Sequence, residues 1–320
     1  MSDVDNDSMA NGRPVDAVIV GAGPIGIELA TVFARAGISC VHLEAGPIGA
    51  TITRWPRNTR FFSSAEWVAV AGVPIQTEGQ EIVTGEHYLA YLRQIVEIFD
   101  LRVQTYEEVV DITGSSGDFT VRTRDLSGAS HAYNAANVVL ATGDMNHPRA
   151  IGVPGEELPH VTHLWQDPHL YFQRELLIVG GHNSAVEAAI RCWRAGARVS
   201  ISYRGPELSE KRLISRLFLE IDLLIRNGQI RFYPNTVPAE IRPGVALLRP
   251  SSVDAADATD GDVGTRDPIE VPADFVYLAT GFEMDQRLYE QLGVQTEGEE
   301  RRPLHDPATM ESNVPGVYVA

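Results

Sequence analysis

The stretch Val-Ile-Val-Gly-Ala-Gly-Pro-Ile-Gly at residues 18–26 joins an apolar run to a glycine-rich turn, and a helical run follows it. Gly21 permits a tight turn, Gly23 leaves the backbone open to a pyrophosphate, and Gly26 allows close packing of helix on strand. The helix begins beside Pro24, where free backbone N–H groups face a phosphate. This succession of strand, turn and helix predicts a dinucleotide-binding turn.

An acidic residue stands at the end of the next apolar strand. Residues 39–43 form that strand, and Glu44 follows them directly. A carboxylate at this strand end is typical of a group that accepts hydrogen bonds from ribose hydroxyls. Together with the turn, Glu44 makes the pattern far more specific than three spaced glycines alone.

The same pattern recurs at residues 176–185, which read Leu-Leu-Ile-Val-Gly-Gly-His-Asn-Ser-Ala and precede a second helical run. His182 stands where the pattern has its middle glycine, either with its imidazole near the phosphates or as an exposed loop histidine. The following strand, residues 198–203, ends at Arg204 instead of an acid, which suits a 2′-phosphate and favours NADP over NAD. An ordinary surface arginine is the alternative. The nucleotide-binding residues predicted at this turn are Gly180, Gly181, His182, Asn183, Ser184 and Arg204.

With both turns in view, the chain resembles the two-dinucleotide-binding-domain flavoproteins of the thioredoxin-reductase-like branch. Two Ala-Thr-Gly segments match the family's crossings between domains, and residues 107–112 look like the strand whose backbone meets the FAD adenine. More narrowly, residues 59–64, 72–74 and 180–185 resemble the bacillithiol-disulfide-reductase (YpdA-type) group. The resemblance adds the following cofactor-binding residues: Phe62, Ser63, Val110, Thr142, Gly143, Thr280 and Gly281.

The resemblance implies an α/β fold with two Rossmann-like three-layer dinucleotide-binding domains, the second inserted in the first. We expect a disordered tail over residues 1–13, an FAD-binding domain over 14–150, an NADPH-binding domain over 151–280, and a return segment over 281–320. In the family the return strand continues into a glycine-containing turn and a helix, so the segment looks truncated. Residues 251–267 are rich in Ser, Ala, Asp and Gly and predict an exposed hairpin loop.

The function implied is an FAD-dependent NADPH oxidoreductase, which passes hydride from NADPH through the flavin to a disulfide or a quinone-like acceptor. Residues 61–64 either line the flavin pocket or form a buried aromatic pair with local turn hydrogen bonds. His163 and Trp165 lie where thioredoxin reductases keep their dithiol, so they either face the flavin or acceptor or pack as loop residues.

Two departures from the family concern cysteine. The segment 162–169 lacks the Cys-x-x-Cys pair of thioredoxin reductases, and Ile25 replaces the cysteine that the bacillithiol-reductase group places in its first turn. No catalytic residue is therefore assigned. Two alternatives stay open: a flavin monooxygenase, although Pro159 stands where that group's fingerprint has glycine, and a non-catalytic redox sensor or degenerate fragment.

Composition narrows the class of protein further. The chain has 320 residues and a formal net charge of −17, which argues against binding to nucleic acid or to anionic membranes. Cys40 and Cys192 are expected to be small buried hydrophobes, and no metal-ligand spacing is present. No long apolar run or signal peptide is seen, so a cytoplasmic enzyme is expected. Homodimerisation, which is common in the family, is left open.

Overall fold

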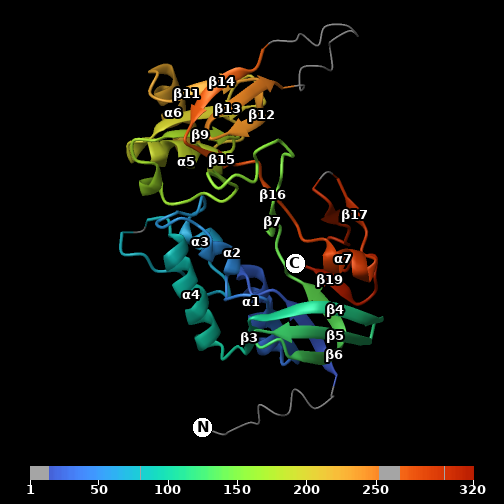
Figure 1. The fold of residues 1–320 in the computed structure, drawn as a ribbon. Helices are drawn as coiled ribbons and strands as arrows, with labels where there is room; N and C mark the ends of the chain where they lie inside the picture. Colours follow the sequence, from blue (N-terminus) through green and yellow to red (C-terminus); the bar gives the residue numbers. More distant parts are fainter. Residues whose placement is uncertain (1–13, 80, 252–266, 299) are drawn as a thin grey trace. The chain divides into compact units, whose positions relative to one another are not determined.

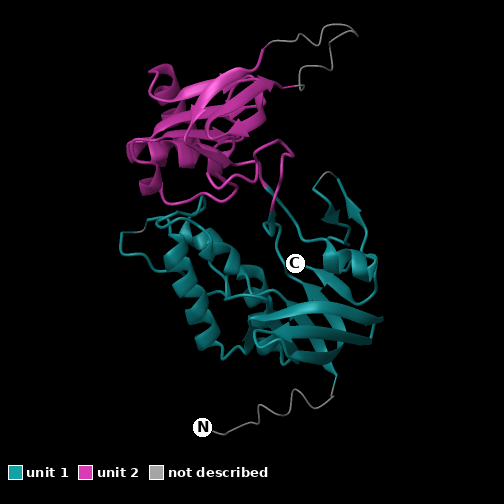
Figure 2. Cartoon of the chain, in the orientation of Figure 1, with its two compact units in different colours: residues 1–147, 282–320 teal, residues 148–281 magenta. Residues whose placement is uncertain are grey.

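The structure is a computed structural model that describes residues 14–79, 81–251, 267–298 and 300–320. The chain divides into two compact units, residues 1–147 with 282–320 and residues 148–281, so the second unit is inserted in the first (Figure 2). The predicted α/β class with two Rossmann-like domains is confirmed. The tail predicted over residues 1–13 and most of the hairpin loop predicted over 251–267 lie outside the described residues.

The first unit is built on a seven-stranded sheet, in which five strands run parallel in the order β3-β2-β1-β6-β19 (Figure 1). The apolar residues of β1 pair with both neighbours, as Ile19 does with His42 and Val139. The parallel strands are β1 (Val15–Val20), β2 (Cys40–Glu44), β3 (Val103–Thr105), β6 (Ser130–Leu140) and β19 (Val317–Val319).

Helices cover one face of this sheet and an antiparallel meander covers the other. Ile27 of α1 and Leu92 of α4 share a buried cluster on the helical side, whereas Val18 and Val20 pack against Val121 of the meander. The elements of these layers are α1 (Pro24–Ala36), α2 (Ala50–Thr53), α3 (Ala65–Val68), α4 (Gly85–Ile98), β4 (Glu107–Ser115), β5 (Asp118–Asp125) and α7 (Arg287–Leu292).

The second unit repeats the plan. Five parallel strands in the order β11-β10-β9-β15-β8 have helices on one face and the meander β12-β13-β14 on the other. Its strands are β8 (Val161–Thr162), β9 (Glu175–Val179), β10 (Arg198–Tyr203), β11 (Arg231–Pro234), β12 (Thr236–Arg242), β13 (Gly244–Pro250), β14 (Ile269–Ala273) and β15 (Phe275–Leu278), with helices η1 (Pro168–Tyr171), α5 (Asn183–Arg194) and α6 (Ser215–Arg226). Short strands complete the chain: β7 (His147–Pro148), β16 (Phe282–Glu283), β17 (Thr296–Glu297) and β18 (Arg302–Pro303).

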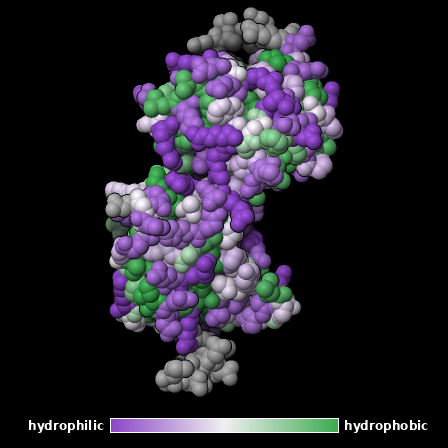
Figure 3. All heavy atoms as spheres, turned by 90° about the vertical axis from the view of Figure 1, so that its left-hand side faces the viewer, coloured by the Kyte–Doolittle hydropathy of each residue, from purple (hydrophilic) through white to green (hydrophobic). Residues whose placement is uncertain are grey.

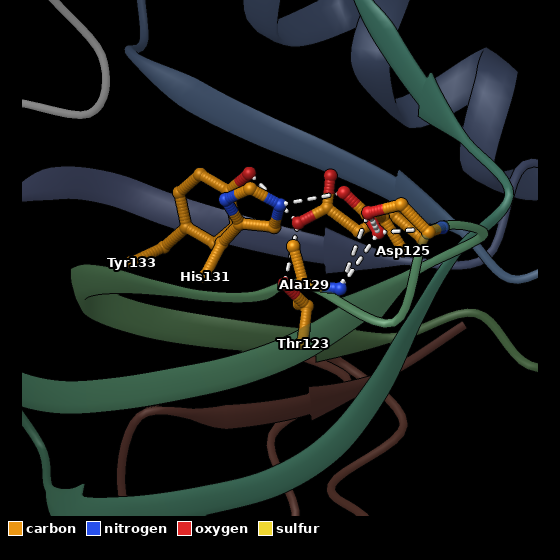
Figure 4. A network of polar contacts seen from close by, with 7 residues as sticks. Thr123, Asp125, Ala129, His131 and Tyr133 are labelled. Atoms are coloured by element: carbon orange, nitrogen blue, oxygen red, sulfur yellow. Dashed lines mark hydrogen bonds and ion pairs between the residues drawn. The ribbon is translucent and has the colours of Figure 1, made fainter.

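A polar network fixes the meander of the first unit (Figure 4). The buried carboxylate of Glu107 accepts hydrogen bonds from the hydroxyls of Thr123 and Tyr133, so it ties the start of β4 to β5 and β6. His131 Nε2 lies 3.0 Å from the Asp125 carboxylate. This pairing lowers the pKa of Asp125 and raises the pKa of His131.

On the face drawn in Figure 3, hydrophobic side chains are interspersed with hydrophilic ones. The exposed large apolar residues belong to both units and include Ile25, Phe62, Trp67, Leu219 and Leu223. In the part of the chain that the structure describes, no helix combines the length and the apolar character needed to cross a bilayer.

Candidate functional site

The three glycines of the first turn differ in the space around them. Gly21 has a φ of +111°, and a Cβ added there would stand 2.3 Å from the Ala141 carbonyl oxygen. A Cβ on Gly26 would stand 2.0 Å from the Gly21 carbonyl oxygen, so helix and strand pack too closely for any side chain. A Cβ on Gly23 would meet nothing within 4 Å. The open position is therefore where a phosphate can approach the backbone.

Glu44 lies against this turn. One carboxylate oxygen accepts from the backbone N–H of Ala22 at 2.7 Å, and the other accepts from Gly46 at 2.8 Å. Each carboxylate oxygen keeps a further lone pair for a ribose hydroxyl. Helix α1 begins next to it, with Gly23 as N-cap and Pro24 in its first turn. The backbone and the carboxylate thus fit the pyrophosphate and ribose of a dinucleotide.

His42 is a residue of this turn that the sequence analysis missed. Its Nε2 lies 2.9 Å from the Gly21 carbonyl oxygen, and the residue is only 2% exposed. Because a carbonyl only accepts, Nε2 carries the proton, and the buried Nδ1 has no partner among the described residues. Burial lowers the pKa of His42, against the opposing effect of the Gly21 carbonyl. The only available signal was a histidine within an otherwise apolar strand.

Other predicted FAD contacts lie within the first unit. Val110 falls at a register shift between Val109 and Asp111, so it is the extra residue of a β-bulge in strand β4. The hydroxyl of Thr142 lies 3.2 Å from that of Tyr289, and Gly143 has a φ of +70°. The Thr142 carbonyl oxygen accepts from Asn146 Nδ2 at 3.0 Å, so a contact between FAD and these residues stays a prediction.

The aromatic segment 61–64 does not form a buried pair. Phe61 packs in the helical layer, with ring centroids 4.9 Å from Trp55 and 4.6 Å from Tyr88. Phe62 is 44% exposed, and Ser63 is exposed beside it. The interpretation of a buried aromatic pair is therefore wrong, because only Phe61 packs into the hydrophobic cluster of the helical layer.

The second turn keeps the first glycine and changes the rest. Gly180 has a φ of +141°, and a Cβ there would stand 2.6 Å from the Ala279 carbonyl oxygen. A Cβ on Gly181 would stand 2.5 Å from the ring of Tyr203, which fills that space. Ala185, where the first turn has its last glycine, is buried at 1% exposure. A methyl group is thus accommodated between this helix and strand.

Polar residues of the second turn differ in their surroundings. Asn183 Oδ1 accepts from the backbone N–H of Ile214 at 3.0 Å, so Asn183 holds the segment before α6. His182 is the exposed N-cap of α5, and Ser184 is exposed beside it. Burial, and then the charges of Arg212 and Arg204, lower the pKa of His182. Two guanidinium groups therefore lie close to this turn.

The second Ala-Thr-Gly segment is engaged in backbone contacts. The Thr280 hydroxyl donates to the Arg149 carbonyl oxygen at 2.7 Å, and the Gly281 carbonyl oxygen accepts from the Arg149 N–H at 3.0 Å. Gly281 has a φ of +96°. These bonds hold together the two segments through which the chain enters and leaves the second unit.

His163 and Trp165 have partners within the second unit. His163 Nε2 lies 3.2 Å from the buried Glu156 carboxylate, which also accepts from the backbone N–H groups of residues 151 and 152. The Arg191 guanidinium lies 4.4 Å from the ring centre of Trp165. Both side chains thus contribute to packing in their own unit.

Neither cysteine is placed as a reactive thiol. Cys192 lies buried in α5, and burial raises the pKa of its thiol to about 12. Cys40 is half-buried at the start of β2, and burial raises its pKa as well. Because the thiolate is the reactive form, both groups are poor nucleophiles. Ile25 is 56% exposed at the helix start.

Comparisons with known proteins agree on one family. The family model described as pyridine nucleotide-disulphide oxidoreductase matches residues 18–320. The chain is 32% identical over 304 residues to the bacilliredoxin reductase Bdr of Bacillus subtilis, which covers 95% of this chain and 88% of that protein. The solved bacillithiol disulfide reductase Bdr (YpdA) from Bacillus cereus superposes with a TM-score of 0.87 at 31% identity, covering 96% of this chain and 90% of the other. A ferredoxin–NADP reductase of Ignicoccus hospitalis is 25% identical, over 95% of this chain and 88% of that protein.

Proposed function

Because the chain belongs to the pyridine nucleotide-disulphide oxidoreductase family, we propose that its first unit holds FAD, its second unit binds NADPH, and its acceptor is a disulfide. The protein is a flavoprotein oxidoreductase that uses FAD and NADPH. The predicted resemblance to the bacillithiol-disulfide-reductase group is confirmed. A solved flavin-containing monooxygenase from Stenotrophomonas maltophilia shares the fold at 20% identity.

The FAD assignment rests on the first turn. Gly23 leaves an open approach for a pyrophosphate, and Glu44 presents a carboxylate for ribose hydroxyls. Val110, Thr142 and Gly143 supply backbone groups further along the same unit. Bound FAD supplies the chemistry of accepting two electrons as hydride and passing them to an acceptor. The protein's own part is to position the nucleotide and to exclude water.

The NADPH assignment rests on the charge of the second turn. Arg204 is exposed at the end of β10, where a 2′-phosphate is recognised in such folds. Phe62, Ser63, Thr280 and Gly281 remain predicted contacts of the two cofactors.

The acceptor assignment is carried by one observation: two relatives that match nearly the whole chain at over 30% identity are named as reductases of bacilliredoxin and of bacillithiol disulfide, yet the described residues contain no pair of neighbouring cysteines. Cys40 and Cys192 lie in different units and both are unreactive. We therefore infer direct reduction of a disulfide that contains bacillithiol. The overall reaction is NADPH plus a proton plus one disulfide, which gives NADP⁺ and two thiols. Location in the cytoplasm and homodimerisation remain predictions.

The test is steady-state NADPH oxidation by the purified, FAD-loaded full chain, with bacillithiol disulfide, glutathione disulfide or a quinone as acceptor. We expect the fastest turnover with bacillithiol disulfide and two thiols released per NADPH. The matched control is Gly23→Leu, which should lack FAD and all three activities. Turnover of the quinone without thiol release from either disulfide would overturn the acceptor assignment.

A further inference from the structure

Three basic side chains converge on the second turn without an anionic partner. His182 is the N-cap residue of α5, and its side chain makes no capping hydrogen bond. Arg204 follows β10 and Arg212 precedes α6, and both act electrostatically on the imidazole. Among the residues that the structure describes, no acidic side chain forms an ion pair with either arginine. An anion bound here would pair with the guanidinium groups and would favour the protonated form of the imidazole.

The position of His182 indicates which anion it meets. Counted from the first glycine of each turn, His182 corresponds to Gly23, the residue with open space around it. In such turns a pyrophosphate approaches the backbone at this position. Arg204 stands instead at the strand end, where a 2′-phosphate is recognised. The two residues therefore address different phosphates of one dinucleotide.

We propose that His182 takes up a proton when a nicotinamide dinucleotide binds, and that the resulting imidazolium pairs with the pyrophosphate. This inference rests on the proposed NADPH site in the second unit. It adds to that site a proton-coupled step and a residue that acts on every nicotinamide dinucleotide, whatever its 2′ substituent.

The sign of the effect follows from the charges around the ring. In the free protein, burial and then Arg212 and Arg204 lower the pKa of His182 from its ordinary value of 6.5, so the ring is neutral near pH 7. A pyrophosphate beside the ring favours the charged form and raises the pKa. Between the two values, binding tightens as the pH falls, by up to about tenfold per pH unit.

NAD⁺ separates this effect from a second titrating group. The 2′-phosphate of NADP⁺ loses its own last proton at about pH 6, so its titration overlaps that of the histidine. NAD⁺ has the pyrophosphate without the 2′-phosphate. Proton uptake on NAD⁺ binding therefore reports on the protein alone.

The experiment is isothermal titration calorimetry of the FAD-loaded full chain with NADP⁺ and with NAD⁺, which bind without reducing the flavin. Two buffers with different heats of ionisation give the number of protons taken up. We expect proton uptake with NAD⁺, and with NADP⁺ a smaller net uptake, because the 2′-phosphate releases its own proton when it pairs with Arg204. His182→Gln should abolish this proton uptake. It should also lower the affinity for both nucleotides by the same factor, which we expect to be about tenfold at pH values below the pKa of the bound ring. His182→Lys, with a fixed charge, should bind both nucleotides tightly, and its affinity for NAD⁺ should not depend on pH.

Arg204→Ala is the matched control, because it should weaken NADP⁺ alone and keep proton uptake with NAD⁺. His182 is exposed, so circular dichroism should show the parent fold in each variant. Proton uptake that persists in His182→Gln, or a loss confined to NADP⁺, overturns the inference. Binding without uptake in the parent overturns the inference alone, whereas failure to bind either nucleotide overturns the NADPH site as well.

Discussion

The two nucleotide turns share one backbone plan and differ in the residue at their middle position. Gly21 and Gly180 both have a positive φ, and both back onto the carbonyl oxygen of an alanine in an Ala-Thr-Gly segment. The first turn then has Gly23 with open space, whereas the second has the side chain of His182. In the proposed FAD site, recognition would therefore depend mainly on the shape of the backbone.

In the proposed NADPH site, recognition would depend mainly on charge. The Glu44 carboxylate accepts hydrogen bonds from the backbone N–H groups of Ala22 and Gly46. In contrast, Arg204 and Arg212 form no ion pair in the described structure. Interactions between exposed charges are screened by salt. The comparison teaches that one backbone plan can bind two dinucleotides through different forces, and that the two bindings should respond differently to substitution.

The largest expected effect is on helix packing. Gly26→Ala would bring its methyl 2.0 Å from the Gly21 carbonyl oxygen, so the helix must move, and we expect unfolding to become easier by about 3 kcal/mol or more. Ala185→Gly, the corresponding change in the second turn, removes a buried methyl and should cost about 1–2 kcal/mol. Urea unfolding followed by circular dichroism measures both. Equal losses would contradict the difference in packing between the turns.

A substitution at the open position should separate binding from folding. Gly23→Leu meets nothing within 4 Å of its Cβ, so the fold should persist while the side chain blocks the pyrophosphate. We expect FAD affinity to fall by at least about a hundredfold, or about 2.7 kcal/mol, and the protein to be colourless. The absorbance of bound flavin per chain is the measurement. His182→Leu, the matched change in the second turn, should keep its FAD; stoichiometric flavin in Gly23→Leu would refute the FAD assignment.

The charge of the second turn should set cofactor preference. Arg204→Ala should raise the KM for NADPH about ten- to a hundredfold, because a charge-assisted contact contributes roughly 1.5–3 kcal/mol, and it should leave NADH nearly unchanged. Arg226→Ala is a suitable control, since that exposed arginine pairs with Asp222 on α6. Equal changes for NADPH and NADH would remove Arg204 from the 2′-phosphate.

His42 should make the first unit sensitive to acid. Its pKa is lowered from 6.5 in the folded state, so the unfolded chain binds more protons and stability falls as the pH drops below about 6.5. The slope from this group is at most about 1.4 kcal/mol per pH unit. His131 has a raised pKa and acts in the opposite sense, because its contribution is lost as the pH rises. Urea unfolding of the parent and of His42→Gln between neutral and mildly acidic pH should show a flatter profile in the variant; parallel profiles would exclude His42.

The smallest expected effect concerns the cysteines. Replacing Cys40 by Ser and Cys192 by Ala should leave NADPH-driven turnover of the disulfide within a few-fold of the parent, since neither thiol is reactive. Assays with and without a thiol alkylator check this. Loss of disulfide turnover on alkylation of the parent, with flavin reduction intact and the fold preserved, would make one of these thiols the working group.

Local patterns in the sequence predicted the strand-turn-helix units, because glycine spacing and apolar runs act over a few neighbouring residues. Helices α1 (Pro24–Ala36) and α5 (Asn183–Arg194) follow the two glycine turns, as the sequence predicts. The sequence alone could not predict the tertiary contacts that require glycine at these positions. Gly21 meets Ala141, and Gly181 meets Tyr203, through pairings of distant strands that no local pattern encodes.

Side-chain direction was equally hard to predict. Which of Phe61 and Phe62 faces inward depends on how residues 59–64 pass the helical layer. The amino-acid sequence of this segment does not determine that direction. His42 was overlooked because alternation in a strand buried on both faces gives no inside and outside to compare. The bond from His42 to the Gly21 carbonyl oxygen becomes visible only when β1 and β2 are placed in register.

The bulge at Val110 has a counterpart, since Ala239 falls at the matching register shift of β12 in the second unit. Each shift changes the phase of the strand, so buried positions move from every second residue to a spacing of three. The first six residues of β4 and of β12 have the same pattern of buried and partly buried positions, although their amino-acid sequences differ. A sequence search for apolar residues at every second position would detect β4 and β12 only up to their bulges. A search for the phase change itself would recover the internal repeat that the amino-acid identities conceal.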